Sequence, residues 1–139
     1  MYSSTTLSAD FPVRLVVLEQ QLAADLMASL YYTAADPYAV RLAFHPGLYA
    51  PVEWVIAREL LTGGLDSLTG DGDVRVWPSE DGEPVIYIAL TSPSGDALFE
   101  APHDAVADFL RNTARIVPLG GESAFVNIDA ELADLLGCA

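Results

Sequence analysis

The sequence contains no lysine, and its six basic residues face twenty Asp and Glu residues, which gives a net charge of −14. Proteins that bind DNA or RNA need clustered Lys and Arg to neutralise phosphates. The composition therefore disfavours nucleic-acid binding and adsorption to an anionic membrane, and it favours partners with basic patches. Without lysine, a Walker-type phosphate loop and a Schiff-base enzyme are both excluded.

Cysteine and long apolar runs are also scarce. The single cysteine, Cys138, cannot form an internal disulfide, which agrees with a reducing compartment. Charged residues interrupt each apolar stretch before it reaches the roughly 18 residues of a membrane span. Residues 1–10 are rich in Ser and Thr and have no basic segment followed by an apolar one, so no secretory signal is expected. We expect a cytoplasmic protein with no integral membrane segment.

The patterns that mark catalytic or metal sites are missing. His45 and His103 are the only histidines, and neither has a second histidine at i+3 or i+4. The acidic residues around Gly70 and Gly72 do not follow the EF-hand order and predict a tight turn before a strand. No third glycine completes a dinucleotide motif, and there is no Gly-x-Ser-x-Gly elbow. We expect no enzymatic activity, no catalytic residue, no metal and no cofactor.

The periodicity of the chain predicts an α+β fold in a single domain over 1–139. Strands are expected at 13–19, 22–33 and 39–44, although Ala and Met in the second stretch also suit a helix. A helix should then open at Pro51, with Val52, Val55, Ile56 and Leu60 on one side, and stop at Gly63-Gly64.

The same order of elements is expected in the second half of the chain. Strands are predicted at 74–77, 84–91 and 97–100, followed by a helix that opens at Pro102 and a last helix at 128–136. The result is two successive βββα units with antiparallel sheets plus a C-terminal helix. We expect an ordered core at about residues 11–136 and a flexible segment at 1–10.

The helix expected after Pro51 supplies the candidate binding residues. Its helical spacing places Trp54, Arg58 and Leu61 beside the first apolar side, and a helix that is apolar on more than one side needs more than one partner surface. This predicts oligomerisation. Glu53, Trp54, Arg58 and Glu59 are the partner-binding candidates, with ordinary solvated positions as the alternative.

Several segments, in order, resemble the SsgA-like proteins of spore-forming actinomycetes. They are Asp36-Pro-Tyr-Ala-Val40, Glu53-Trp-Val-Ile-Ala-Arg-Glu-Leu-Leu61, Gly72-Asp-Val-Arg-Val-Trp-Pro78, Ile88-Ala-Leu-Thr-Ser-Pro-Ser-Gly95 and Phe109-Leu-Arg-Asn-Thr113. The similarity runs from about Phe11 to Leu136 and is closest to the SsgB branch. It implies a homotrimer whose subunit has a whirly-like fold.

The resemblance also implies a non-enzymatic role in cell division. An SsgB-type protein marks the future septum and recruits FtsZ, the tubulin-like division protein, with help from an SsgA-type paralogue. The alternative is a protein that binds single-stranded nucleic acid on a whirly-like scaffold, with aromatic residues as a stacking platform. That function would require Arg14, Arg41, Arg75, Arg111 and Arg115 to gather in one groove, and we predict that they do not.

Overall fold

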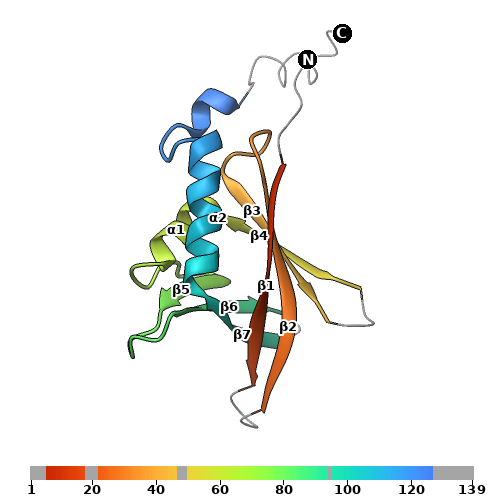
Figure 1. The fold of residues 1–139 in the computed structure, drawn as a ribbon. Helices are drawn as coiled ribbons and strands as arrows, with labels where there is room; N and C mark the ends of the chain where they lie inside the picture. Colours follow the sequence, from red (N-terminus) through yellow and green to blue (C-terminus); the bar gives the residue numbers. More distant parts are fainter. Residues whose placement is uncertain (1–5, 18–21, 47–49, 94, 127–139) are drawn as a thin grey trace.

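A curled antiparallel sheet of seven strands forms most of the molecule (Figure 1). The structure is a computed structural model, and it describes residues 6–17, 22–46, 50–93 and 95–126. The strands are β1 (Thr6–Val17), β2 (Leu22–Thr33), β3 (Ala39–His45), β4 (Val52–Ala57), β5 (Val74–Pro78), β6 (Val85–Ser92) and β7 (Gly95–Pro102). Their order across the sheet is β4-β3-β2-β1-β7-β6-β5, so that β4 and β5 are the two edges.

Two helices lie on the same side of this sheet (Figure 1). They are α1 (Arg58–Gly64), which follows β4, and α2 (His103–Ile116), which follows β7; a short 3-10 helix, η1 (Glu122–Phe125), comes after α2. The inward side of α2 carries Val106, Phe109, Leu110 and Thr113, all buried. We call the face that α2 covers the concave face, and the opposite one the convex face.

Strict alternation along the strands separates the two faces. On β3, for example, Val40, Leu42 and Phe44 are buried in the core on the concave face. Phe44 stacks on Phe99 of β7 with ring centroids 3.9 Å apart. Because β3 and β7 are three strands apart, about 14 Å in a flat sheet, this contact shows how strongly the sheet curls.

The helix expected from Pro51 is wrong in its first half, because residues 52–57 form β4. Val52, Val55 and Ile56 are β-branched and Trp54 is aromatic, and such residues fit a pleated strand better than a helix. Register with β3 places Val52, Trp54 and Ile56 on the concave face and Glu53 and Val55 on the convex face. The helix begins only at Arg58.

The two βββα units are therefore corrected to ββββα followed by βββα, and the expected separate sheets are one sheet joined by β1 and β7. Residues 6–10 belong to β1, so the ordered part begins before Phe11. The strand at 22–33 and the helix after Pro102 are confirmed. Gly70, with φ of +95°, confirms the turn before β5. The helix expected at 128–136 lies outside the described residues.

Candidate protein-binding surface

The four candidate binding residues do not form one surface. Glu53 is exposed on the convex face of β4, whereas Trp54, its neighbour, is half-buried on the concave face. Arg58 is only 1% exposed, so the prediction that a helix exposes it was wrong. Glu59 is exposed and, together with Arg58, lines a hollow of about 450 Å³ between α1 and the turn after α2. The four residues therefore lie in different environments.

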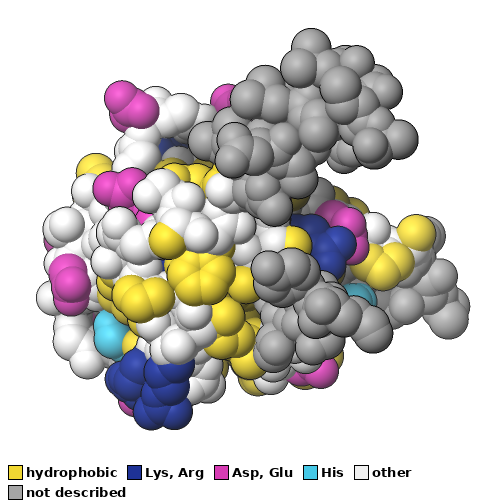
Figure 2. Space-filling view, turned by 90° about the horizontal axis from the view of Figure 1, so that it is seen from above, with side chains coloured by type: hydrophobic (Ala, Val, Ile, Leu, Met, Phe, Trp, Pro, Cys, Tyr) yellow, Lys and Arg dark blue, Asp and Glu magenta, His cyan; other side chains and the backbone are white. Residues whose placement is uncertain are grey.

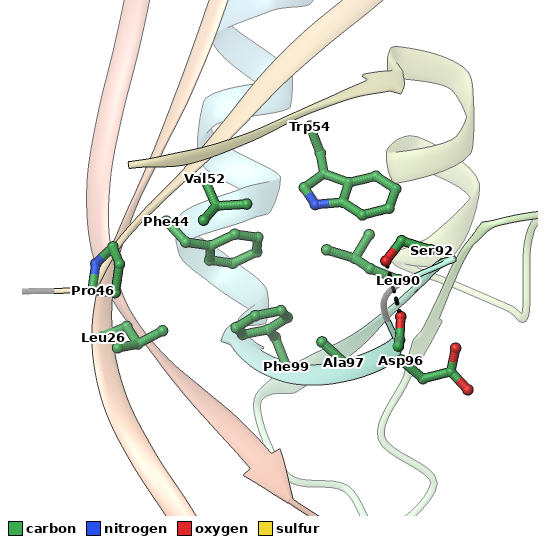
Figure 3. Close-up of a pocket in the computed structure, with 11 residues that line it drawn as sticks. Leu26, Phe44, Pro46, Val52, Trp54, Leu90, Ser92, Asp96, Ala97 and Phe99 are labelled. Atoms are coloured by element: carbon green, nitrogen blue, oxygen red, sulfur yellow. Dashed lines mark hydrogen bonds between the residues drawn. The ribbon is translucent and has the colours of Figure 1, made fainter. Parts of the chain in front are cut away.

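An apolar groove of about 350 Å³ lies where β4 faces the β6–β7 hairpin across the curl of the sheet (Figure 3). Its wall on the β4 side is made by Val52 and Trp54, and its floor by Phe44 and Phe99. Asp96, at the start of β7, is the one charged residue among those that line it. The groove exists because α2 covers only part of the concave face, which leaves this part of the apolar lining open.

The free edge of β4 borders this groove. The backbone N–H of Arg58 donates to the carbonyl of Tyr38 at 2.8 Å, one step beyond the pair formed by Ala39 and Ala57. Hydrogen-bonded and non-hydrogen-bonded pairs alternate along an antiparallel ladder. The N–H and C=O groups of Glu53 and Val55 therefore point away from β3, toward the open edge.

The Trp54 side chain lies between this edge and the groove. Figure 3 shows its indole ring with the nitrogen on the side of Phe44 and Val52. Trp54 makes no side-chain hydrogen bond to any other described residue, so the indole N–H remains available as a donor. An aromatic ring with one polar donor is a frequent anchor at protein interfaces.

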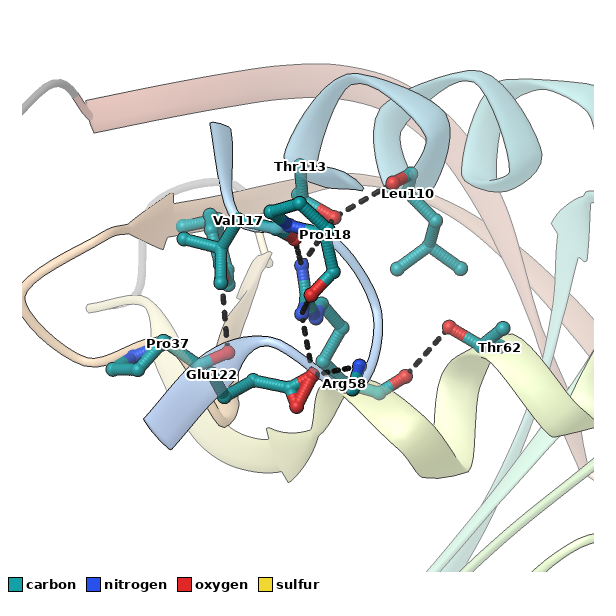
Figure 4. A network of polar contacts seen from close by, with 10 residues as sticks. Pro37, Arg58, Thr62, Leu110, Thr113, Val117, Pro118 and Glu122 are labelled. Carbon is teal, nitrogen blue, oxygen red and sulfur yellow. Dashed lines mark hydrogen bonds and ion pairs between the residues drawn. The ribbon is translucent and has the colours of Figure 1, made fainter. Parts of the chain in front are cut away.

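Arg58 has a structural role instead (Figure 4). Its Nη1 donates to the carbonyl of Val117 at 2.7 Å, and its Nη2 forms an ion pair with Glu122 Oε1 at 2.9 Å. The guanidinium carbon also lies 5.1 Å from the centroid of the Tyr32 ring. The first residue of α1 thus holds the chain segment that follows α2. No periodic pattern in the sequence indicates this role, because Val117 and Glu122 lie about sixty positions away.

The same network shifts the pKa values of two ionisable groups, Glu122 and Tyr32. The backbone N–H of Gly120 donates to Glu122 at 2.7 Å, and this bond, reinforced by the Arg58 guanidinium, lowers the pKa of the Glu122 carboxyl below its usual value. Burial raises the pKa of the Tyr32 hydroxyl, against the opposing charge of Arg58. That hydroxyl donates to the carbonyl of Pro37 at 2.9 Å.

A polar chain that sequence reasoning missed lies on the convex face. Ser29 Oγ donates to Asp10 Oδ1 at 2.6 Å and lies 2.9 Å from His45 Nε2. An ionised carboxylate only accepts, so the serine proton goes to Asp10 and the histidine N–H donates to Ser29. Serine stands in the middle, whereas in Ser-His-Asp catalysis histidine does. Among the described residues there is no group of three or more His, Cys, Asp or Glu that could hold a metal.

The arginines are dispersed, as predicted. Arg14, Arg41 and Arg75 lie on the convex face of β1, β3 and β5, whereas Arg111 and Arg115 lie on α2, on the other side of the sheet. Acidic neighbours separate them further, because Arg14 faces Asp25 on one side and Glu100 on the other. Figure 2 shows the basic side chains of one face in separate places among the carboxylates.

The aromatic residues do not form a common stacking platform either. Trp77 stacks on Tyr87 on the convex face, with ring centroids 5.7 Å apart, and Trp77 also lines a depression of about 740 Å³. Trp54 belongs to the concave face, and Tyr32 is buried in the core. In the part of the chain that the structure describes, no helix combines the length and the apolar character needed to cross a bilayer.

Comparison with known proteins explains this architecture. A family profile described as "Streptomyces sporulation and cell division protein, SsgA" matches residues 26–122. The chain belongs to the SsgA family. The resemblance seen in the sequence motifs is thereby confirmed.

Two curated SsgA-family relatives are both named sporulation-specific cell division protein SsgB. The one from Thermobifida fusca is 47% identical over 135 residues, which are 96% of this chain and 97% of the relative. The one from Streptomyces coelicolor is 48% identical over 134 residues, again 96% and 97% of the two chains.

Solved structures of the family have the same fold. The crystal structure of an SsgA-like sporulation-specific cell division protein from Thermobifida fusca superposes with a TM-score of 0.85 at 45% identity, over 96% of this chain and 98% of that one. A second structure, from work on SsgB mutations and longitudinal cell division during sporulation of Streptomyces coelicolor, gives a TM-score of 0.83 at 46% identity, over 90% and 98%. The curled seven-stranded sheet with its two helices is the SsgA-like fold.

Proposed function

We propose that this protein is a non-enzymatic adaptor for sporulation-specific septation, which marks division sites and recruits FtsZ or promotes its assembly. The observation that carries the proposal is the near full-length similarity to relatives named sporulation-specific cell division protein SsgB. Its partners would be FtsZ, an SsgA-type paralogue and further copies of itself in a homotrimer, and its place would be the cytoplasmic side of the division septum.

The surface chemistry supports an adaptor. Partner binding by an adaptor needs exposed groups of fixed geometry and no reaction. The β4 edge, with its outward N–H and C=O groups, and the apolar groove beside Trp54 provide such groups. The net charge of −14 favours a partner with basic residues.

Nucleic-acid binding on a whirly-like scaffold is the weaker candidate. A single-strand binder needs a cationic groove beside its aromatic residues. Here the arginines are divided between the convex face and α2, and one of the six is buried against Glu122.

Co-sedimentation with FtsZ polymers tests the proposal. The purified protein is mixed with FtsZ assembled in GTP, at low and at moderate salt, with unassembled FtsZ in GDP as the control. We expect the protein to pellet only with polymer, and light scattering of the free protein to give the mass of a trimer. Failure to pellet at both salt concentrations would contradict direct recruitment, and binding to single-stranded DNA would then be measured.

A further inference from the structure

We propose that the β4 edge and the adjoining groove together bind an extended peptide segment of a partner, with an apolar side chain in the groove and a basic side chain near Asp96. This inference rests on the proposed adaptor function and specifies the surface and the chemistry of the partner.

The edge fixes the backbone of the ligand. Glu53 and Val55 each present an N–H and a C=O away from β3, and β4 has no neighbour on that side among the described strands. An extended segment that pairs with these groups becomes an eighth strand, which is the usual mode of peptide addition to a sheet edge. Val52 and Val55 are 50% and 65% exposed, so apolar surface at this edge is still open to a ligand.

The groove fixes the side chains. Residues opposite each other in a strand pair point to the same face. A ligand residue opposite Trp54 would therefore point to the concave face, where Phe44, Phe99 and Leu90 line the groove. The volume of about 350 Å³ accommodates one or two apolar side chains. The indole N–H of Trp54 can donate to a carbonyl of the same ligand.

The charge favours a basic ligand. Asp96 stands at the rim of the groove with its carboxylate directed away from Phe44 and Trp54 (Figure 3), no arginine lines the groove, and Glu53 lies next to Trp54 on the convex face of β4. In a protein that carries a net charge of −14, a cationic ligand gains attraction from the whole molecule as well as from these two carboxylates. The sequence features expected of the ligand are alternating apolar residues with at least one Arg or Lys.

Selection from a phage library of random 12-residue peptides tests the proposal. The full-length protein is the target, and binding of synthetic copies of the selected peptides is measured by fluorescence anisotropy. Val55→Pro removes one outward N–H and no bond to β3, so the sheet should remain intact. We expect apolar, basic peptides whose affinity falls about tenfold or more with Val55→Pro or Trp54→Ala.

The matched controls separate this surface from general attraction to an acidic protein. Trp77→Ala makes the same change on the convex face and should leave the affinity unaltered, whereas Asp96→Lys should weaken binding of the basic peptides. The proposal is wrong if no peptide is selected, or if the selected peptides bind Val55→Pro and Trp54→Ala as they bind the unmodified protein. It is also wrong if a multimer of this protein already uses the β4 edge. In that case the peptides would fail to displace the neighbouring subunit, and light scattering would show that Val55→Pro dissociates the multimer.

The same variants keep this inference distinct from the proposed function. If the unmodified protein pellets with FtsZ polymers and Val55→Pro pellets equally, recruitment stands and the peptide site is not the surface that carries it. If the peptides bind at the edge but the unmodified protein does not pellet, the peptide site stands and direct recruitment of FtsZ fails.

Discussion

Replacement of Arg58 by Met tests the role of the buried cation, because it removes the guanidinium and keeps much of the side-chain volume. The lost interactions are the hydrogen bond to Val117 O at 2.7 Å, the ion pair with Glu122 at 2.9 Å and the contact with the Tyr32 ring at 5.1 Å. Because desolvation of the two charges offsets the Coulombic gain of the ion pair, only the other two interactions enter the sum. A hydrogen bond from a charged donor contributes about 1.5–3 kcal/mol. A desolvated cation–π contact contributes about 0.5–2 kcal/mol. Together they predict a loss of about 2–5 kcal/mol in the free energy of unfolding.

Thermal and urea unfolding followed by circular dichroism measure this loss. For a domain of this length, each kcal/mol lowers Tm by about 3 °C, so Arg58→Met should lower it by about 6–15 °C. Arg41→Met is the matched control, because the Arg41 guanidinium also lies over a tyrosine, 5.5 Å from the Tyr31 centroid, but is exposed. Its Tm should change by no more than about 3 °C.

The outcome that refutes the reasoning is a small, equal effect of the two substitutions. It would mean that the cost of removing the Arg58 guanidinium from water cancels what its partners contribute. Arg58→Lys provides a second test. The lysine ammonium lacks the planar fork with which the arginine guanidinium contacts a carbonyl and a carboxylate at once. The stability of Arg58→Lys should therefore lie between that of the unmodified protein and that of Arg58→Met.

Three further predictions concern stability. The pKa of Glu122 is lower in the folded protein than its usual 4.5, so its contribution to the free energy of unfolding is present above about pH 4.5 and is lost as the pH falls through the folded pKa. Glu122→Gln should therefore flatten the dependence of Tm on pH in that range. An unchanged dependence would count against the network. A Cβ on Gly64 would overlap Val76, so Gly64→Ala should cost about 1–3 kcal/mol in urea unfolding, whereas Gly72→Ala, which meets no atom within 4 Å, should be neutral or slightly stabilising. Ser29 is 3% exposed and hydrogen-bonded to two side chains, so Ser29→Ala should cost about 1–2 kcal/mol, and a neutral result would show that the polar chain adds nothing.

Part of the fold could be predicted from the sequence, because turn residues and periodicity act locally. Pro102 and the apolar spacing after it defined α2, and Gly70 marked the turn before β5. The region 52–57 failed because Val52, Val55 and Ile56 satisfy helical spacing, while Val52, Trp54 and Ile56 satisfy strand alternation. The choice between helix and strand depends on pairing with the neighbouring strand β3, and the local sequence pattern carries no information about that pairing.

The candidate site could be predicted only in part. Trp54 was identified as a partner-binding candidate, and the structure gives it an open groove and a free strand edge, although for a reason different from the helix proposed. Arg58 was placed on the surface because arginine usually lies there. Its burial depends on Val117 and Glu122, which lie after α2 in the other half of the chain. Long-range pairs of this kind leave no periodic trace in a sequence.

The position of Arg58 directly after β4 joins the open strand edge to the end of α2. A segment that pairs with β4 would restrict the backbone up to Ala57, and the next residue holds Val117 and Glu122. Amide hydrogen exchange in β4, in α1 and in residues 117–122 should therefore slow together when the edge is occupied, because the Arg58 side chain links α1 directly to Val117 and Glu122. Through one side chain, an event at the rim of the sheet becomes measurable at the far end of the helix.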